Sequence, residues 1–361
     1  MTRIAVLPGD GIGPEVIDAA LPVLDAVAPG WSIEFGEIGW GCWRREGEPI
    51  PAATWDLIER SDATLMGAIT SKPPREAEAE LPPRLQGTGR RYASPVIALR
   101  RRLGLYANIR PITDLYGDTY DFLVIRENTE GLYAGYDYRG LDDDLWGLVG
   151  EHPGAVESGR DDTAVALRLQ TRSGLDRIFR CAFDRAAAGG HTRVTLADKP
   201  NVLRASGELA RERFDAIAAE HPDIEAHNAN VDAVAMAMVR SPGSFGVIVA
   251  ENMFGDILSD LGAGVMGGLG LAGSANVGGR GSLFEPVHGS APDIAGCGVA
   301  NPFATILTVG QMLAELGAPD ESARVRAAVR EVVRNGAVVT PDLGGTASTA
   351  AAASEVIRRL G

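Results

Sequence analysis

Two aspartates, Asp256 and Asp260, stand four residues apart in the stretch FGVIVAENMFGDILSDLGAG, which covers residues 245–264. The apolar run 246–250 predicts a buried strand, and a helix is expected from about Phe254. Residues four apart lie on one face of a helix, so both carboxylates should project together, and they repel each other unless a cation lies between them. Rigidly presented carboxylate oxygens suit Mg²⁺ or Mn²⁺, although most such pairs belong to a solvated helix face.

Arginines form a second group, in the stretches ALRRRLGLYANIRP and FLVIRENTEGLY. The guanidinium group binds carboxylates through two parallel hydrogen bonds. Arg101 and Arg102 are explained well enough as helix-surface residues paired with neighbours. Arg110 and Arg126 fit that explanation poorly, because each lies beside an apolar strand. A local cluster of this kind can bind a small anionic substrate even though the formal net charge of the chain is −14.

Two further charged residues follow or begin predicted elements. The strand 193–197 leads into Asp-Lys-Pro-Asn, which places Lys199 at the carboxyl end of a strand, where α/β proteins bind ligands. Asp232 lies at the start of a predicted helix, where a negative charge is favourable without any metal. Taken alone, Lys199 would be an ordinary surface lysine and Asp232 an ordinary first-turn acid.

Glycine-rich stretches offer three candidate cofactor loops. The loop 8–14, PGDGIGP, lies between a strand and a helix but does not match G-x-G-x-x-G. The stretch 268–273, GLGLAG, matches formally and has Asp293 twenty residues later, yet it trails a helix instead of following a strand. Neither is therefore a Rossmann fingerprint. The segment 284–293, FEPVHGSAPD, is the better candidate, because it combines small residues, exposed donors and one acid.

The composition limits the class of protein. A chain of 361 residues exceeds what one hydrophobic core usually serves, so two domains or one large α/β unit are expected. The net negative charge argues against nucleic acid as a partner. Cys42, Cys181 and Cys297 contain no C-x-x-C pair and are expected to be buried thiols. The first apolar run is too short for a signal peptide and no run approaches a membrane span, so a cytoplasmic location is expected.

Hydrophobic periodicity places most elements and leaves two segments without one. A strand is expected at 63–68, and helices are expected where apolar residues recur at helical spacing. The polar, proline-rich segment 72–91 is expected to be a functional or mobile loop. The segment 140–161 shows no clear period and is interpreted as a loop or a dimer arm. The further helices are predicted at about 173–189, 303–316, 321–335 and 348–360.

Seven motifs occur in order over nearly the whole chain: LPGDGIGPEV, LRRRLGLYANIRP, IRENTEGLY, DKPNVL, VDAVAM, ENMFGDILSD and EPVHGSAPDIAG...ANP. Together they resemble the β-decarboxylating dehydrogenases, a family that includes isocitrate, isopropylmalate, homoisocitrate and tartrate dehydrogenases. The resemblance implies an isopropylmalate dehydrogenase-like two-domain α/β fold that is not Rossmann. It implies a cofactor-binding domain built from residues 1–105 and 267–361, and a dimerisation and catalytic domain in residues 106–266. It also implies a homodimer, or a higher oligomer, with shared active sites.

The same resemblance implies a role for each matching residue. Tyr133 would be the catalytic acid, with a pKa lowered by nearby cations, and Lys199 of the partner subunit the base. Asp256 and Asp260 would hold Mg²⁺ or Mn²⁺ together with Asp232 of the partner subunit. The expected substrate contacts are Ser94, Arg100, Arg110, Arg126, Tyr133, Lys199 and Asn201. The expected cofactor contacts are Ile12, Thr70, Ser71, Glu285, His288, Gly289, Ser290, Ala291, Asp293, Ile294 and Asn301.

Asp293 and Ile294 bear on the choice of nucleotide. NADP-dependent members of the family resemble one another in having Lys and Tyr at these two positions. An acid instead accepts hydrogen bonds from the ribose hydroxyls of NAD and repels a 2'-phosphate. The resemblance therefore implies NAD as the cofactor.

The substrate is expected to be a 2-substituted malate in the sense of a 3-substituted 2-hydroxy acid, with the substituent on the carbon next to the hydroxyl carbon. The helix 92–100, YASPVIALR, looks most like the pattern of homoisocitrate dehydrogenase. Arg90 and Arg91 could reach an anionic tail, a carboxylate or a phosphonate, or could simply solvate a mobile loop. Pro200 and Asn230 depart from the usual family pattern. The alternatives are 3-isopropylmalate, isocitrate, a phosphonate-bearing malate, or a regulatory subunit without catalytic activity.

Overall fold

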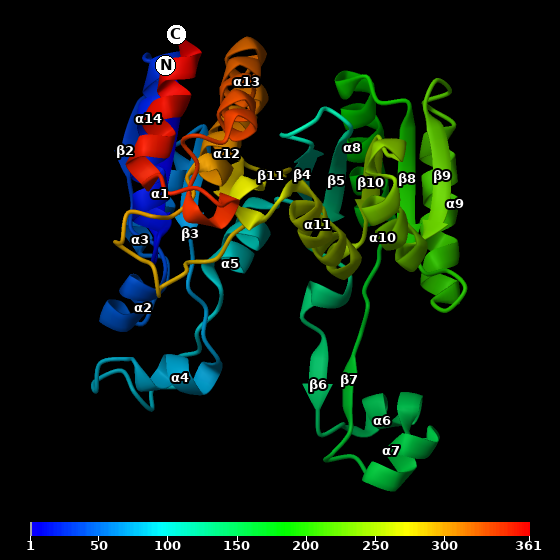
Figure 1. The fold of residues 1–361 in the computed structure, drawn as a ribbon. Helices are drawn as coiled ribbons and strands as arrows, with labels where there is room; N and C mark the ends of the chain where they lie inside the picture. The colour runs from blue at the N-terminus through cyan, green and yellow to red at the C-terminus, as the bar shows by residue number, and fades with distance from the viewer. Residues whose placement is uncertain (1) are drawn as a thin grey trace.

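One ten-stranded sheet runs through the protein, which a computed structural model describes over residues 2–361 (Figure 1). Its strand order is β2-β1-β3-β12-β11-β4-β5-β10-β8-β9. The strands are β1 (Arg3–Gly9), β2 (Ser32–Phe35), β3 (Ala63–Ala68), β4 (Ala107–Thr113), β5 (Asp121–Glu127), β8 (Arg193–Asp198), β9 (Glu225–Asn230), β10 (Val247–Ala250), β11 (Gly273–Val277) and β12 (Leu283–Pro286). The strands from the two chain ends therefore form one half of the sheet, and the middle of the chain forms the other.

Helices cover each half of the sheet separately (Figure 1). In the half built from the chain ends, α1 packs on α12 and α14, and α12 on α13, so both termini lie together. In the other half, α8 packs on α9, and α10 on α11. The helices are α1 (Gly13–Val27), α2 (Trp40–Glu46), α3 (Ala52–Glu59), α4 (Pro74–Ala79), α5 (Pro95–Leu103), α6 (Asp143–Val149), α7 (Pro153–Ser158), α8 (Arg172–Gly189), α9 (Arg204–Ala218), α10 (Val231–Arg240), α11 (Asn252–Met266), α12 (Phe303–Glu315), α13 (Pro319–Asn335) and α14 (Thr349–Leu360).

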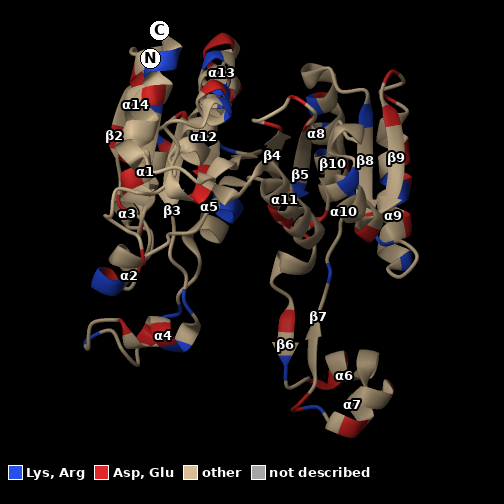
Figure 2. Ribbon diagram, in the orientation of Figure 1, with Lys and Arg blue, Asp and Glu red and all other residues tan. Residues whose placement is uncertain are grey.

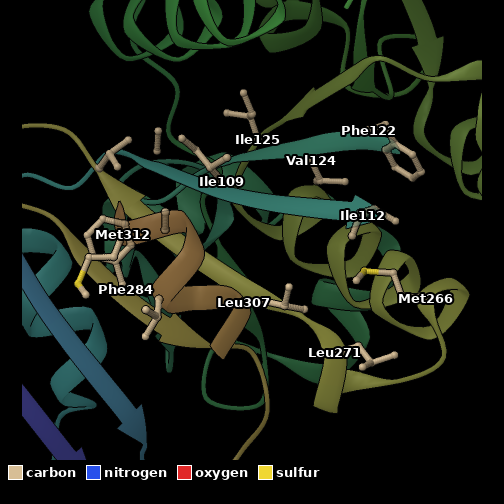
Figure 3. Close-up of a cluster of buried hydrophobic side chains, with 14 of the residues drawn as sticks. Ile109, Ile112, Phe122, Val124, Ile125, Met266, Leu271, Phe284, Leu307 and Met312 are labelled. Atoms are coloured by element: carbon tan, nitrogen blue, oxygen red, sulfur yellow. The ribbon is translucent and has the colours of Figure 1, made fainter. Parts of the chain in front are cut away.

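Two antiparallel strands join the halves. β4 is antiparallel to both β5 and β11, and β11 is antiparallel to β12, whereas the other neighbouring strands are parallel. Apolar side chains fill the junction, among them Ile109, Ile112 and Phe122 (Figure 3). A mixed sheet with this order is not a Rossmann sheet, which confirms the predicted fold class.

The predicted elements agree closely with the structure where the apolar pattern is strong. β3 spans the six residues predicted, and α1 begins with Pro14 in its first turn, where proline costs no hydrogen bond. The 268–273 stretch forms a short 3₁₀ turn, η3 (Leu269–Leu271), that follows α11 and leads into β11. It thus lacks the strand-to-helix context of a dinucleotide loop, as expected.

The segment 72–91 differs from the predicted loop because it contains α4 and packs against α2. The Trp43 indole N–H donates a 2.8 Å hydrogen bond to the Ala77 carbonyl, and Leu81 is buried beside it. Lys72 forms an ion pair with Glu80 at 2.5 Å. The apolar residues that hold this segment are few, and their partners are distant in sequence, so the segment shows no hydrophobic period from which α4 could be predicted.

The segment around 140–161 forms an arm that projects from the second half (Figure 1). Two short strands, β6 (Asp137–Arg139) and β7 (Ala164–Ala166), pair antiparallel and carry α6 and α7 at their tip. These two helices were not predicted, because they are too short to show a period. Cys297 is exposed, which corrects the expectation of three buried thiols, while Cys42 and Cys181 are buried. No helix within residues 2–361 is long and apolar enough to cross a membrane.

Candidate active site

The helix that carries both aspartates, α11, begins directly after the buried strand β10 and its polar corner. It starts at Asn252, two residues earlier than predicted, because the Glu251 side chain caps it by accepting a 3.0 Å hydrogen bond from the Phe254 N–H. Gly255 lets α11 approach β5 closely. A Cβ at that position would lie 2.7 Å from the Arg126 Cβ, so any larger residue would push the helix away from the arginine.

Arg110 lies on β4 and points at the aspartate face of α11. Its guanidinium donates hydrogen bonds of 2.7 Å to Asp260 Oδ1, 2.7 Å to Ser259 Oγ and 2.9 Å to Asn108 Oδ1. It also lies 3.8 Å from Asp256 Oδ1. The side chain is only 8% exposed. A buried cation therefore lies between the two carboxylates, and it compensates the repulsion expected from their spacing.

Arg126, on the neighbouring strand β5, completes the cluster. Its guanidinium is hydrogen-bonded to Asp256 Oδ1, and its Nε donates a 2.9 Å hydrogen bond to Asn252 Oδ1. Burial, together with the nearby Arg100, lowers the pKa of Arg126 to about 10, and burial also lowers the pKa of Arg110. A pKa of about 10 still leaves Arg126 positively charged at neutral pH. Such cations can receive an anionic ligand.

Arg100, on α5, is held by a different partner from its neighbours. Its Nη2 donates a 3.0 Å hydrogen bond to Glu285 on β12, and the two side chains are only 11% and 10% exposed. Arg101 instead donates to the Ala134 carbonyl at 3.2 Å, and Arg102 pairs with Glu59 at 2.6 Å. Arg101 and Arg102 are thus the paired surface residues that their sequence context indicated. Ser94 occupies the cap position of α5 without a capping hydrogen bond from its side chain.

Tyr133 lies beside the cluster on a short 3₁₀ turn, η1 (Leu132–Ala134), which packs on α11. The Arg126 guanidinium is 5.7 Å from the centre of the tyrosine ring. Burial and the charge of Asp256 raise the pKa of Tyr133, and the opposing effect of Arg126 is smaller. In the single chain the pKa of Tyr133 thus shifts against the predicted direction, because burial and Asp256 outweigh Arg126. The predicted lowering also depends on Lys199 of the partner subunit, and for the assembled site it stays a prediction.

Lys199 and Asp232 lie together, separate from the arginine cluster. Lys199 follows β8, Asp232 is in the first turn of α10, and the ammonium group is hydrogen-bonded to Asp232 Oδ1. This hydrogen bond holds the pKa of Asp232 below its usual value. Within residues 2–361 no group of three His, Cys, Asp or Glu side chains is placed to hold a metal. One chain thus brings Asp256 and Asp260 together but does not add Asp232 to them.

The candidate cofactor residues lie on two loops in contact. Ser290 Oγ is 2.7 Å from Thr70 Oγ1, and the Ile12 N–H donates a 2.8 Å hydrogen bond to the Ser290 carbonyl. A Cβ on Gly11 would lie 1.9 Å from that carbonyl oxygen, so the contact requires glycine. Ala291 has a φ of +36°, an uncommon value for a residue with a side chain. Such a strained, closely packed loop is typical of a ligand site.

The remaining candidate cofactor residues surround this loop. The Nε2 atom of His288 is buried and has no hydrogen-bond partner within residues 2–361, and burial lowers the pKa of the ring. Asn301 donates a 2.9 Å hydrogen bond to Asp342 Oδ2. Asp293 is exposed, whereas Ile294 packs partly buried on the apolar cluster around Ile12. Because this ring nitrogen is buried, the ring would have to turn before it could form a hydrogen bond to a ligand.

A buried amide network beneath the arginines was missed in the sequence. Asn276 on β11 accepts hydrogen bonds from Asn108 at 2.8 Å and Asn128 at 2.9 Å, and donates one of 2.9 Å to Glu285. Through Asn108, the network continues to Arg110. It therefore connects the supports of Arg100 and Arg110 across the junction of the sheet. Asparagines in or beside apolar strands were the only available signal, because Asn276 is 168 residues from Asn108 and 148 from Asn128.

Comparisons with known proteins agree over the whole chain. The profile of the family described as isocitrate/isopropylmalate dehydrogenase matches residues 3–360. The chain belongs to this family. Its relatives include Protein DlpA of Legionella pneumophila, which is 51% identical over 98% of this chain. The chain spans only 58% of the length of that relative. Homoisocitrate dehydrogenase of Methanocaldococcus jannaschii is 39% identical, with 100% of this chain and 98% of that protein covered.

A solved structure supports the same assignment to the isocitrate/isopropylmalate dehydrogenase family. The crystal structure of isocitrate dehydrogenase from Methylococcus capsulatus superimposes with a TM-score of 0.86 at 38% sequence identity. The match covers 100% of this chain and 99% of that one. The suspected family is confirmed, and with it the coarse class: a decarboxylating dehydrogenase that acts on a hydroxy acid.

Proposed function

We propose that this dehydrogenase oxidises and decarboxylates a malate substituted at carbon 3, a 3-substituted 2-hydroxy acid, using NAD and Mg²⁺ or Mn²⁺. The observation that carries the proposal is the contact between two buried arginines and two helical aspartates. Arg110 and Arg126 supply cations for substrate carboxylates, while Asp256 and Asp260 supply hard oxygen ligands beside them. A hydroxy acid that also contacts a metal ion needs both kinds of group in one place.

One chain supplies only part of the ligand set that a divalent cation needs, so a complete metal site would require a second subunit. Asp256 and Asp260 offer two carboxylates, and hard cations such as Mg²⁺ take additional oxygen ligands. Asp232 of the partner subunit would provide another carboxylate. The metal, when bound, would act as a Lewis acid that stabilises negative charge developing on the substrate oxygen. The charges of Arg110 and Arg126 favour the same anionic character from the opposite side.

Each catalytic group has a separate task in the proposal. Arg100, Arg110 and Arg126 bind and orient the carboxylates of the malate core. Lys199 of the partner subunit takes the proton of the substrate hydroxyl, and Tyr133 returns a proton to the carbon that loses carbon dioxide. Tyr133 is 45% exposed in one chain, so it lies at the surface beside the arginine cluster.

NAD is the proposed hydride acceptor, and the geometry of its loop supports this choice. The exposed carboxylate of Asp293 is available to the ribose hydroxyls and would repel a 2'-phosphate. The unpaired Nε2 of His288 and the contact of Ser290 with Thr70 fit a nucleotide bound across both loops. The nicotinamide, when bound, accepts the hydride from the hydroxyl carbon.

A homodimer with shared sites is part of the proposal. Exposed apolar side chains gather on α10 and α11, where Met236 is 58%, Val239 62% and Ile257 57% exposed. Apolar exposure on adjoining helices indicates a surface that another protein covers. A second copy docked there would bring its Lys199 and Asp232 toward the first copy's aspartates. We also propose that the chain divides into two domains at about residues 105 and 266. The support is that β4 and β11, which follow these positions, join the two halves of the sheet.

The tail of the substrate is the least constrained feature. The sequence pattern around Ser94 favours a homoisocitrate-like acid with an anionic tail. Arg90 is nevertheless not free to bind such a tail, because its Nη1 donates hydrogen bonds of 3.1 Å to the Gly47 carbonyl and 2.5 Å to Glu48. Arg91 is exposed and makes no ion pair with residues 2–361. Of the two arginines next to Ser94 in the sequence, Arg91 is therefore the one free to bind an anionic tail.

A second candidate substrate is favoured by one side chain. Ile97, on the same helix as Arg100, is 48% exposed. An exposed isoleucine on the substrate helix suits an apolar tail such as that of 3-isopropylmalate, because burying it against a charged group would leave that group without hydrogen bonds. Isocitrate and a phosphonate-bearing malate remain further alternatives on the anionic side.

The deciding experiment is a kinetic panel. Purified protein, NAD and Mn²⁺ are assayed against malates that carry isopropyl, carboxymethyl, carboxyethyl and phosphonomethyl groups. The proposal expects the highest kcat/KM for an anionic tail, and Arg91→Ala should then raise KM for that substrate alone. A preference for the isopropyl compound would support the second candidate. No turnover of any member would favour a regulatory subunit, against which the intact cluster around Arg110 and Asp256 argues.

A further inference from the structure

Arg168 forms a buried ion pair with the residue that directly precedes Lys199. Its backbone lies on the return from the arm, between β7 and α8. The Nη2 atom donates a 2.8 Å hydrogen bond to Asp198 Oδ1, and the two side chains are 10% and 6% exposed. Asp198 is the last residue of β8, so the pair fixes the end of the strand from which Lys199 projects.

The same guanidinium contacts two helices. Its carbon lies 5.3 Å from the centre of the Phe254 ring on α11, two residues before Asp256. Its Nη1 lies 3.4 Å from Ser206 Oγ on α9. One side chain therefore contacts the strand end that carries the lysine and the helix that carries the metal-binding aspartates.

The turn after Asp198 leaves the lysine backbone little freedom. Pro200 restricts the preceding residue, Lys199, to an extended conformation. The Lys199 carbonyl accepts hydrogen bonds from the Val202 and Leu203 N–H groups at 3.1 and 2.9 Å. Pro200 itself packs on Gly207 of α9, where a Cβ would lie 2.8 Å from the Pro200 Cα. The proline that departs from the family pattern is thus accommodated by a glycine.

The surroundings of the ion pair make its arginine hard to replace. Arg168 and Asp198 line a small, narrow pocket whose lining also includes the acidic residues Glu127, Glu130 and Glu251. Arg168 is the one basic residue in that lining within residues 2–361. Removal of one partner from a buried pair leaves an uncompensated charge, although such pairs contribute little net stability. The pair is therefore better explained by placement of the turn than by stability.

We propose that Arg168 is a positioning residue, which holds Asp198 and thereby fixes the Lys199 amine beside Asp232. The inference rests on the proposed function, in which Lys199 is the base. It also assigns a task to the arm, because the returning chain delivers Arg168 to the end of β8. Misplacement of a reacting group by about 1 Å can cost on the order of a hundredfold in rate, so a loosened turn should be visible in turnover.

The experiment uses a property of this sequence: Lys72 and Lys199 are its only lysines. Brief treatment with sulfo-N-hydroxysuccinimide acetate, followed by peptide mass spectrometry, gives the labelling rate of Lys199 relative to Lys72. Lys72 pairs with Glu80 and lies far from Lys199 in the sequence, so it is the internal reference. In Arg168→Met we expect this ratio to change by at least about threefold. We also expect kcat to fall at least about tenfold with KM within about twofold. Arg168→Lys should restore most of both.

Arg213→Met is the matched control, because Arg213 pairs with Asp176 at 2.6 Å between α8 and α9 without touching the Lys199 turn. It should leave the labelling ratio and kcat unchanged. If Arg168→Met does not fold, Asp198→Asn makes the same test with the side-chain volume kept. A folded variant in which either kcat or the labelling ratio stays at the wild-type value would overturn the inference. Absence of turnover in the wild type would instead reject the proposed function, and the labelling ratio would still report on the turn.

Discussion

Arg110 donates a 2.7 Å hydrogen bond to Asp260, so a candidate substrate-binding cation and a candidate metal ligand neutralise each other in the single chain. Arg126 and Asp256 form a second pair of the same kind. In each pair, one partner would bind an anionic acid and the other a divalent cation. A metal bound to the carboxylates would release the guanidinium donors for the substrate, and the substrate would likewise release the carboxylates.

Metal and substrate should therefore bind cooperatively, and turnover should require the metal. EDTA should abolish activity, and Asp256→Asn should lower kcat by orders of magnitude with the fold intact, because a ligand and a charge are lost. Calorimetry should show weaker binding of the malate without Mn²⁺ than with it. Asp162→Asn, an exposed residue paired with Arg139 on the arm, is the control and should change neither quantity. Full activity without divalent metal would disprove the assignment of both aspartates.

Cofactor preference can be tested at a single exposed residue. We expect kcat/KM to favour NAD over NADP by roughly 2 kcal/mol, about thirtyfold, from the repelled phosphate and the lost ribose hydrogen bonds at Asp293. Asp293→Lys should shift the ratio toward NADP by more than about tenfold. Equal use of both nucleotides by the wild type would contradict this explanation. Ile294 is partly buried, so its substitution belongs in a separate variant.

Asp114 should make stability depend on pH at the acidic end. Burial would raise its pKa, but hydrogen bonds from Thr119, Gly117 and Tyr116 outweigh burial and lower the pKa to about 2. A carboxyl whose pKa is lower in the folded state stabilises the protein above its unfolded pKa of about 3.9. This contribution, on the order of 2 kcal/mol, is lost as the pH falls through 2.

Urea unfolding of the wild type and Asp114→Asn measures this contribution. The wild type should be more stable by about 2 kcal/mol at pH 6, and the difference should shrink as the pH falls from 4 toward 2. Asp162→Asn, in which the lost carboxylate is exposed, should show almost no difference at either pH. A difference between wild type and Asp114→Asn that is constant with pH would show that the hydrogen bonds do not act through the charge.

The sequence was sufficient for elements whose pattern is local. The strand at Ala63–Ala68 and the helices around Asp256 and Val325 follow from buried apolar runs or a 3.6-residue period, and the structure agrees within a few residues. Charge repulsion between Asp256 and Asp260 predicted a cation beside them, interpreted from the sequence as a divalent metal ion. In the single chain the guanidinium of Arg110 lies there, which the spacing alone did not indicate.

Features that depend on distant contacts could not be predicted. The helix α4 is held by Trp43, thirty-four residues earlier, and the Asn108–Asn276 contact spans 168 residues. The direction of the Tyr133 pKa shift in the single chain could not be predicted either, because it depends on the balance of burial and Asp256 against Arg126. The distribution of charge shows the same limit: acidic and basic residues are spread over both halves of the ribbon, so the net charge does not locate the arginine cluster (Figure 2).

Sharing of the active site between subunits can be tested by complementation. Lys199 and Asp232 pair with each other away from Asp256, so each site would take its base from the other copy. Lys199→Ala and Asp256→Ala homodimers should both be inactive. Mixing them with subunit exchange should restore activity, because each heterodimer keeps one site with both residues. Lack of recovery after exchange has been verified by native mass spectrometry would mean that one chain builds the whole site.

The central claim is that one substrate molecule is both oxidised and decarboxylated. The most direct measurement follows NADH by absorbance and carbon dioxide by membrane-inlet mass spectrometry in the same reaction, with the best malate of the panel and Mn²⁺. The account predicts one carbon dioxide for each NADH, with both products lost together in Asp256→Asn. Formation of NADH without carbon dioxide would contradict it, as would carbon dioxide released without NAD.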